Sequence, residues 1–73
     1  MITVEHEDMS TVVTVMDEQG THEDVQLIQD GTTVYIRQFN EDENGYDLII
    51  LSPTQFINLY LAQSLPEGTY KAQ

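Results

Sequence analysis

Short turn signals divide the first two thirds of the chain into a series of β-rich segments. Residues 11–16, 24–29, 32–39 and 46–51 are rich in Val, Ile, Leu, Thr or aromatic side chains, as is typical of strands. The connections contain Gly20, Asp30-Gly31 and Asn44-Gly45, and Asp30-Gly31 has the composition of a two-residue type I′ hairpin turn. Because every connection is short, we expect consecutive strands to be neighbours in one antiparallel sheet.

A helix start signal follows the fourth of these segments. Ser52 is a preferred N-cap, Pro53 suits the first helical position, and Gln55 completes a capping box. Apolar residues at 56, 57, 60 and 61 then repeat at the helical period, and we expect the helix to end near Gln63 or Ser64. The sequence therefore predicts an α+β domain: a four-stranded antiparallel β-meander closed by one C-terminal α-helix (ββββα).

Residues 1–9 carry a weaker signal, in which Ile2 and Val4 either extend the first strand or form a separate edge. We expect residues 1–73 to form one small acidic domain with a small core. The chain contains no cysteine, which excludes disulfides and thiolate chemistry. Small domains without disulfides or a bound metal often gain stability by pairing with a second copy, so we expect a homodimer.

The charge balance restricts the partners of this chain. Thirteen acidic residues face only Arg37 and Lys71, giving a net charge of −11. This charge argues against binding to duplex nucleic acid and to anionic membranes, and it favours a basic protein partner. The longest uncharged stretch is too polar for a membrane span, and no basic segment followed by an apolar run indicates a signal peptide, so we expect a cytoplasmic location.

The charges are also unevenly distributed along the chain. Residues 1–47 carry twelve acids and Arg37, whereas residues 48–66 carry no charged side chain. A surface helix normally keeps charges on its wet face, and interface cores are depleted of charge. The predicted helix is therefore either a neutral surface or a dimer interface, for which Phe56, Leu59 and Tyr60 are the candidate residues.

Two predicted strands place their side chains on both faces of the sheet. Val34 and Ile36 point one way, and Tyr35, Arg37 and Phe39 point the other way. Residues 48–51 are apolar on both faces, which is typical of a strand covered on two sides. One helix covers only one face, so we expect the other face to carry aromatic residues or to meet a partner.

No motif for catalysis is present: the sequence lacks a nucleophile elbow, a phosphate loop and a dinucleotide fingerprint. Asn40 to Gly45 resembles half of a calcium loop, but Leu51 replaces the bidentate glutamate, which favours a solvated hairpin loop. His6 and His22 each precede two acids, a pattern that more often marks exposed strand ends than a metal site. We expect a non-enzymatic protein without metal or cofactor.

The residues 34–56 resemble part of the positive-cofactor-four type of transcriptional coactivator, a family that binds single strands. Three pieces carry the resemblance in order: residues 34–39 (VYIRQF), residues 44–46 (NGY) and residues 48–56 (LIILSPTQF). The resemblance implies a four-stranded meander, one helix and a dimer formed through the helix and the sheet ends. It further implies strand contacts to nucleic acid, although Asp47 stands where that family has a basic residue.

Three functions follow from these patterns. The first is an acidic protein-protein interaction module, a regulator or inhibitor of a basic protein that itself binds nucleic acid, with DNA mimicry as its extreme form. The second is a single-strand-binding dimer that uses Tyr35, Arg37 and Phe39. The third is a small structural component of a larger assembly, such as a viral or phage particle. For the first, the acidic residues proposed to contact the partner are Asp17, Glu18, Glu23, Asp24, Glu41, Asp42 and Glu43.

Overall fold

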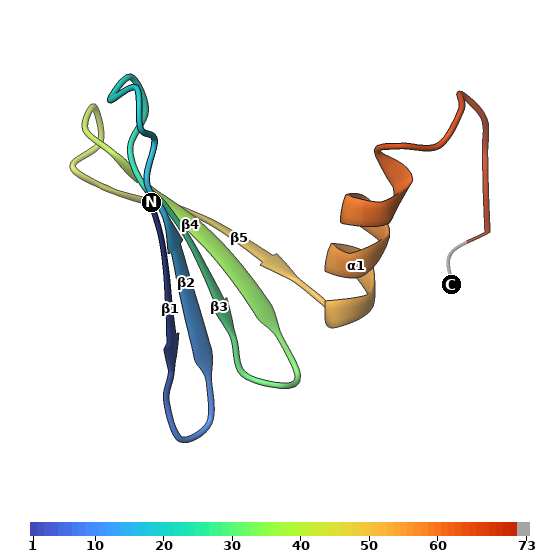
Figure 1. The fold of residues 1–73 in the computed structure, drawn as a ribbon, viewed down its shortest axis with the longest axis horizontal. Coiled ribbons are helices and arrows are strands. Elements are labelled where there is room, and N and C mark those ends of the chain that lie inside the picture. Colours follow the sequence, from blue (N-terminus) through green and yellow to red (C-terminus); the bar gives the residue numbers. More distant parts are fainter. Residues whose placement is uncertain (72–73) are drawn as a thin grey trace.

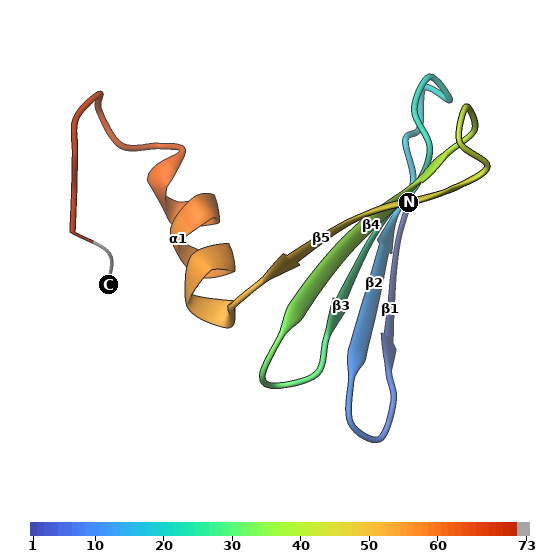
Figure 2. The same ribbon diagram turned by 180° about the vertical axis from the view of Figure 1, so that it is seen from behind.

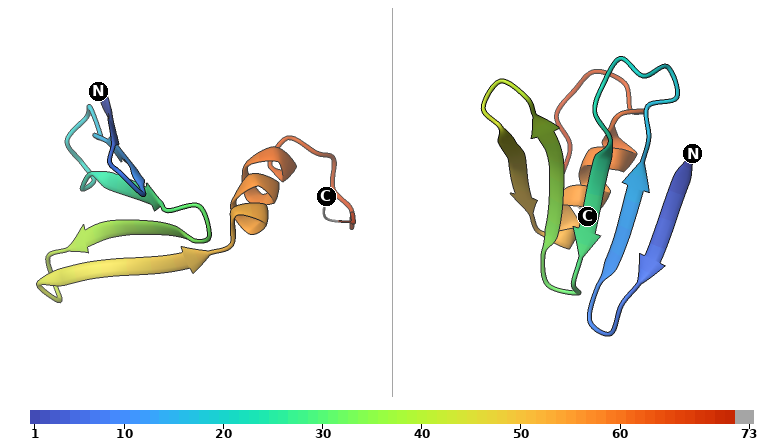
Figure 3. Two further views of the ribbon diagram at one scale, coloured as in Figure 1. Left: turned by 90° about the horizontal axis from the view of Figure 1, so that it is seen from below. Right: turned by 90° about the vertical axis from the view of Figure 1, so that its left-hand side faces the viewer.

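The computed structural model describes residues 1–71 and contains one antiparallel sheet and one helix (Figure 1). Neighbouring strands along the chain are neighbours in the sheet, in the order β1-β2-β3-β4-β5, as the right-hand view of Figure 3 shows. The strands and the helix are β1 (Ile2–His6), β2 (Thr11–Val15), β3 (Val25–Gln29), β4 (Val34–Asn40), β5 (Gly45–Leu51) and α1 (Pro53–Ala62). The predicted α+β meander with a following helix is therefore confirmed at this level.

The prediction of four strands is wrong, because the N-terminal segment forms a fifth. Strand β1 pairs with β2 along its whole length, from Ile2 opposite Val15 to His6 opposite Thr11. The connection carries no glycine or proline signal, and it closes through a 2.8 Å hydrogen bond from the Glu7 amide to the Ser10 carbonyl. Ile2 and Val4 thus form a separate edge strand, one of the two alternatives that the sequence left open.

The connection between β3 and β4 is longer than the two-residue turn that Asp30-Gly31 indicated. Asp30 accepts hydrogen bonds at Oδ1 from the amides of Thr32 and Thr33, at 3.1 and 2.9 Å. Such a side-chain turn holds both threonines out of the strand, so β4 begins at Val34. Gly31 has a φ of +96°, a conformation that favours glycine.

The pairing register separates the residues of the sheet into two faces. One face, here called the apolar face, has an uninterrupted apolar row across all five strands: Val4, Val13, Leu27, Ile36 and Ile49. Its other apolar residues are Ile2, Val15, Val25, Val34 and Leu51. The opposite face, here called the mixed face, combines the polar residues Thr3, Glu5, Thr14, Gln26 and Arg37 with the apolar or aromatic residues Val12, Ile28, Tyr35, Phe39, Tyr46, Leu48 and Ile50. The predicted assignment of β4 and β5 side chains to the two faces is confirmed.

The predicted start of the helix is confirmed in detail. The amide of Gln55 donates to the Ser52 hydroxyl at 3.0 Å, and the Ser52 amide donates to the Gln55 side chain at 3.1 Å. Pro53 occupies the first helical turn, and the helix ends at Ala62 with Gln63 as its C-cap. Reciprocal capping of this kind satisfies two amide groups that have no partner within the helix, and it fixes the residue at which α1 begins.

The helix does not close the sheet, contrary to the expectation from sequence. Figures 1 and 2 show α1 projecting away from the end of β5, and the left-hand view of Figure 3 shows the sheet and the helix side by side along the molecule. No residue of α1 is buried. The one fully buried side chain among the described residues is Val34, opposite Leu51, at the end of the sheet from which the chain enters α1.

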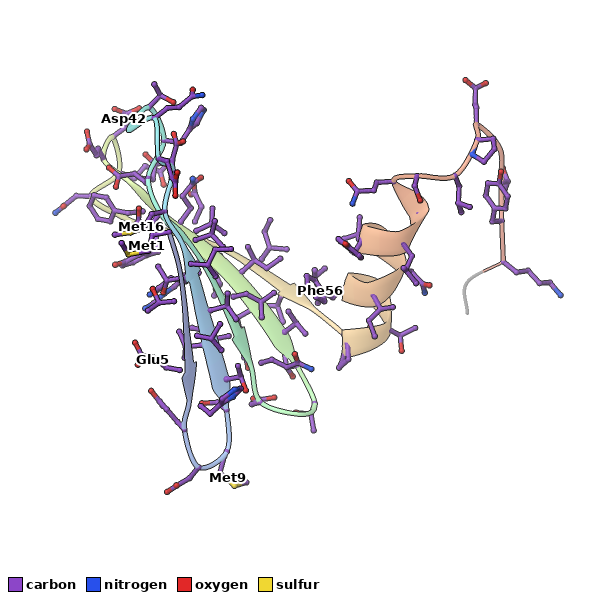
Figure 4. All side chains as sticks on the ribbon, viewed as in Figure 1. Met1, Glu5, Met9, Met16, Asp42 and Phe56 are labelled. Carbon is purple, nitrogen blue, oxygen red and sulfur yellow. The ribbon has the colours of Figure 1, made fainter. Side chains whose placement is uncertain are left out.

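The residues proposed for a dimer interface lie on this projecting helix. Phe56 is half-buried and points from α1 toward the side on which the sheet lies (Figure 4). Leu59 and Tyr60 are 62% and 66% exposed. Across residues 1–71, no helix is both long enough and apolar enough to cross a membrane.

Candidate acidic interaction surface

Two hairpin loops come together at the end of the sheet distant from Val34. The β2–β3 loop spans residues 16–24 and the β4–β5 loop spans residues 41–44, and both lie at the top of the sheet in Figure 1. Asp42 marks this end in Figure 4. All seven predicted partner-binding acids belong to these two loops: Asp17, Glu18, Glu23, Asp24, Glu41, Asp42 and Glu43. The fold therefore gathers at one end acids that are up to 26 positions apart in sequence.

Carboxylates from the two loops contact each other. A hydrogen bond with the Glu41 side chain raises the pKa of Glu23, and partial desolvation and the negative charges of Glu41 and Asp24 act in the same direction. Two like charges this close destabilise each other when both are ionised. A cationic group placed between them would relieve that repulsion.

Asp17 has a structural role within its own loop. Its carboxylate accepts hydrogen bonds from the Thr21 hydroxyl at 2.9 Å and from the amides of Gln19, Thr21 and His22 at 3.2, 3.1 and 2.8 Å. These bonds, the Thr21 hydroxyl first, hold the pKa of Asp17 far below its usual range. The Asp17 side chain is only 25% exposed, so its charge organises the loop and is less accessible to a partner.

Glu18 is also engaged within the chain, because it forms an ion pair with the amino group of Met1. The remaining five acids of the two loops are all exposed. This set is called the acidic cluster below, and it comprises Glu23, Asp24, Glu41, Asp42 and Glu43.

The β4–β5 loop that carries three of these acids is the hairpin loop predicted from sequence. Asn44 adopts a φ of +52°, and its amide donates to the Glu41 carbonyl at 3.2 Å. The Asn40 side chain accepts from the Asp42 amide at 3.0 Å and donates to Asp47 at 3.3 Å. These bonds give the backbone of the loop a defined shape and so fix the positions from which its acids project.

A shallow groove on the mixed face adjoins the acidic cluster. Arg37 lies in it: Nε donates to the Gln26 side chain at 2.6 Å, and Cζ lies 4.7 Å from the centroid of the Tyr46 ring. Phe39 and Tyr46 meet edge to face, with centroids 5.4 Å apart and ring planes at 76°. The residues that line the groove are Thr14, Glu23, Asp24, Gln26, Arg37, Phe39 and Tyr46.

The register explains why this groove combines predicted and unpredicted residues. Tyr35, Arg37 and Phe39 share the mixed face, as the sequence indicated. Tyr46 was not identified as a site residue, although it lies directly opposite Phe39 and diagonally to Arg37. If Asn40 pairs with Gly45 at the end of the hairpin, the next pair along the strands is Phe39 with Tyr46, so the hairpin register predicts this position for Tyr46. Glu23 and Asp24 line the same groove, so a phosphate approaching Arg37 also meets two carboxylates.

The two His-plus-acids segments lie apart, at opposite ends of β2. His6 precedes the β1–β2 turn, where its Nδ1 lies 3.1 Å from the Thr11 hydroxyl. His22 lies in the β2–β3 loop, with Nδ1 3.3 Å from Asp17. Among residues 1–71, no group of three or more His, Asp or Glu side chains is placed to hold a metal ion.

The sequence matches a known protein family. A family model described as a domain of unknown function, DUF8831, matches residues 3–62. The chain belongs to the DUF8831 family. The DUF8831 match begins within β1 and ends at the last residue of α1, so it covers the helix and all of the sheet except Ile2. No curated protein and no solved structure matches this DUF8831 chain.

Proposed function

We propose that this DUF8831 domain is a non-enzymatic interaction module that binds a basic protein through its acidic cluster. The observation that carries the proposal is the convergence of Glu23 and Asp24 from one loop with Glu41, Asp42 and Glu43 from another, at one end of the sheet. A basic partner that places Lys or Arg between Glu23 and Glu41 replaces a repulsive contact by an attractive one.

The chemistry of the partner follows from that arrangement. An array of fixed carboxylates matches a surface that otherwise binds phosphates, so the partner is a DNA- or RNA-binding protein of the cytoplasm. In its extreme form this is mimicry of nucleic acid, with Asp and Glu in the place of backbone phosphates. The domain would then regulate or inhibit its partner by competing with nucleic acid.

The groove favours this proposal over single-strand binding. Arg37 is the only lysine or arginine of the sheet, and its side chain already contacts Gln26 and Tyr46. Glu23 and Asp24 border the same groove, where they repel a phosphate backbone. Stacking of bases on exposed Tyr46 would have to overcome that repulsion.

Affinity capture from a lysate at low salt, with two charge-matched variants, tests the proposal. One variant carries Glu41→Gln, Asp42→Asn and Glu43→Gln; the control carries Glu5→Gln, Glu7→Gln and Asp8→Asn, which remove the same charge at β1 and its turn. We expect the wild type and the control to capture basic nucleic-acid-binding proteins, salt to release them, and the loop variant to lose them.

Two results would contradict the proposal. Equal capture by the two variants would mean that only net charge matters. A complex between the purified domain and oligo(dT) at low salt, with no capture of basic proteins, would instead support single-strand binding through the Arg37 groove.

A further inference from the structure

The amount of apolar surface that a single copy leaves uncovered is the starting observation. Among residues 1–71, Val34 is the one buried hydrophobic residue, although apolar residues make up 40% of the sequence. Ile2, Val4 and Ile49 of the apolar face are 67%, 53% and 56% exposed. A chain of this length that leaves so much apolar surface in water gains little stability from its own core, and oligomerisation is one way in which small domains make up the difference.

The accessible surface area and the radius of gyration also exceed those of a compact monomer of this size. The chain has an accessible surface of 6187 Å², whereas a compact monomer of 8.3 kDa exposes about 4,600 Å². Its radius of gyration is 14.3 Å, against about 11 Å for a compact domain of this length. The excess of about 1,600 Å² per chain, or about 3,200 Å² for two chains, falls in the range of obligate dimer interfaces.

The apolar face and α1 lie on the same side of the molecule. Figure 4 shows Glu5 and Met16 on the side of the sheet away from α1, and Glu5 belongs to the mixed face. The apolar face therefore opens toward the side from which α1 projects. The helix offers apolar side chains of its own, because Ile57, Leu59, Tyr60 and Leu61 are each at least half exposed.

We infer that a second copy of this chain covers the apolar face, with α1 of each protomer packed on the sheet of the other. Each copy supplies one helix and one uncovered sheet face. A two-fold symmetric dimer therefore covers both apolar faces, each with the helix of the other protomer. Such an isologous interface also explains why α1 projects away from its own sheet (Figure 1).

The distribution of charge supports a second copy as the occupant. Helix α1 carries no charged residue, and the ionisable residues on the apolar face are His6 and Asp47, both at its margins. The acidic cluster lies on loops outside this interface. Two chains of charge −11 can therefore meet without bringing carboxylates into the contact, and each dimer presents two acidic clusters.

Ile49 and Ile50 provide a matched pair of positions for the test. They are adjacent on β5 and 56% and 61% exposed in one copy, but they project from the apolar and the mixed face respectively. Sedimentation equilibrium of the full chain should give about twice 8.3 kDa. Ile49→Glu should shift the protein to monomer or unfold it, whereas Ile50→Glu should remain a folded dimer. A folded wild-type monomer, or equal effects of the two substitutions, would overturn the inference.

If Ile49→Glu does not fold, the dependence of wild-type stability on protein concentration tests the same inference. For an obligate dimer, the urea midpoint of the wild type rises with protein concentration. A midpoint independent of concentration would mean that α1 folds back onto its own sheet, and it would overturn the inference.

Cross-linking distinguishes an exchanged helix from a helix that closes on its own sheet. The chain lacks cysteine, so Ile49→Cys and Phe56→Cys can each be introduced as the single thiol. After the two variants are unfolded, mixed and refolded, a short bismaleimide should join Ile49→Cys chains to Phe56→Cys chains. A failure to link the mixture, with efficient linking inside the double variant at high dilution, would contradict the exchange.

Salt separates this inference from the proposed function. Raising NaCl from about 0.05 M to about 0.5 M screens repulsion between two acidic chains, so it should strengthen the dimer. The same change should weaken binding of a basic partner. If high salt releases the partner and the dimer persists, both hypotheses are supported. If a basic partner binds a monomer, only the dimer inference is contradicted; if the protein is a dimer that binds no basic partner, only the proposed function is contradicted.

Discussion

The guanidinium carbon of Arg37 lies 4.7 Å from the centroid of the Tyr46 ring, across the β4–β5 pairing of the mixed face. This contact places the one cation of the sheet over an aromatic ring that is 58% exposed. It lies beside Glu23 and Asp24, at the border between the groove and the acidic cluster. The contact therefore links the stability of the two longest strands to the surface proposed for partner binding.

We expect Arg37 and Tyr46 to be energetically coupled. An exposed cation–π pair contributes about 0.5–1 kcal/mol, so a double-mutant cycle with Arg37→Met and Tyr46→Leu should give a coupling energy of that size in urea unfolding. The matched control is Tyr60→Leu on α1, which should show no coupling to Arg37→Met. Additive effects of Arg37→Met and Tyr46→Leu would mean that the contact contributes nothing to stability.

Acidification should destabilise the β2–β3 loop through Asp17. Hydrogen bonds from Thr21, His22 and Gln19 lower the pKa of Asp17 in the folded state. A lowered folded-state pKa contributes stability above the ordinary aspartate value of about 4, and this contribution is lost as the pH falls toward the folded-state pKa. Asp17→Asn should thus lower the melting temperature at pH 7 and flatten its decline toward pH 2.

The control for that prediction is Asp42→Asn, which removes an acid from the neighbouring loop. Among the described residues, the Asp42 carboxylate accepts none of the hydrogen bonds that order the β2–β3 loop. Its melting profile should keep the acid sensitivity of the wild type. The same loss of acid sensitivity in Asp42→Asn would assign the effect to net charge.

Glu23 should respond to pH in the opposite sense. Contact with Glu41 raises its pKa, so the folded state holds a proton more tightly than the unfolded state does. The associated stability is present below the ordinary glutamate pKa and is lost as the pH rises through the folded-state value. We therefore expect Glu41→Gln to raise the melting temperature at pH 7 and to have little effect at pH 3.

The comparison for this substitution is Glu43→Gln in the same loop. It removes the same charge but not the Glu41 side chain that contacts Glu23. Its melting temperature at pH 7 should rise less than that of Glu41→Gln. Equal increases would show that the direct contact between Glu23 and Glu41 is not the cause.

Loss of the Ser52 hydroxyl should weaken α1. Ser52 accepts from the Gln55 amide at 3.0 Å as the N-cap, and replacement of such a cap by alanine typically costs about 1 kcal/mol. Ser52→Ala should reduce the helical circular dichroism signal and lower the urea midpoint. Ser64 lies beyond the end of α1, and its hydroxyl donates to the Leu61 carbonyl. Ser64→Ala should leave the helical signal and the urea midpoint nearly unchanged. Equal losses in both variants would contradict a special role of the cap.

The local features of this protein follow from its sequence. Ser52, Pro53 and Gln55 determine where α1 begins, because a capping box depends only on residues within one turn. The alternation in β4 likewise assigned Val34 and Ile36 to one face and Arg37 to the other, since side chains of a strand alternate with a period of two. The acidic loops were also apparent as runs of charge between strands.

Other features depend on contacts that no local pattern encodes. The sequence left open whether Ile2 and Val4 extend the first strand or form a separate edge, because an edge strand is stabilised by its pairing with β2. The turn at Asp30 was misassigned because a carboxylate competes with the backbone for two amides. The meeting of Glu23 with Glu41 requires the register between β3 and β4, which brings two separate loops together. The sequence determined the start of α1 and the faces of β4 and β5. The tertiary structure alone decided that α1 leaves its own sheet uncovered, because the packing of a helix depends on which apolar surface it meets.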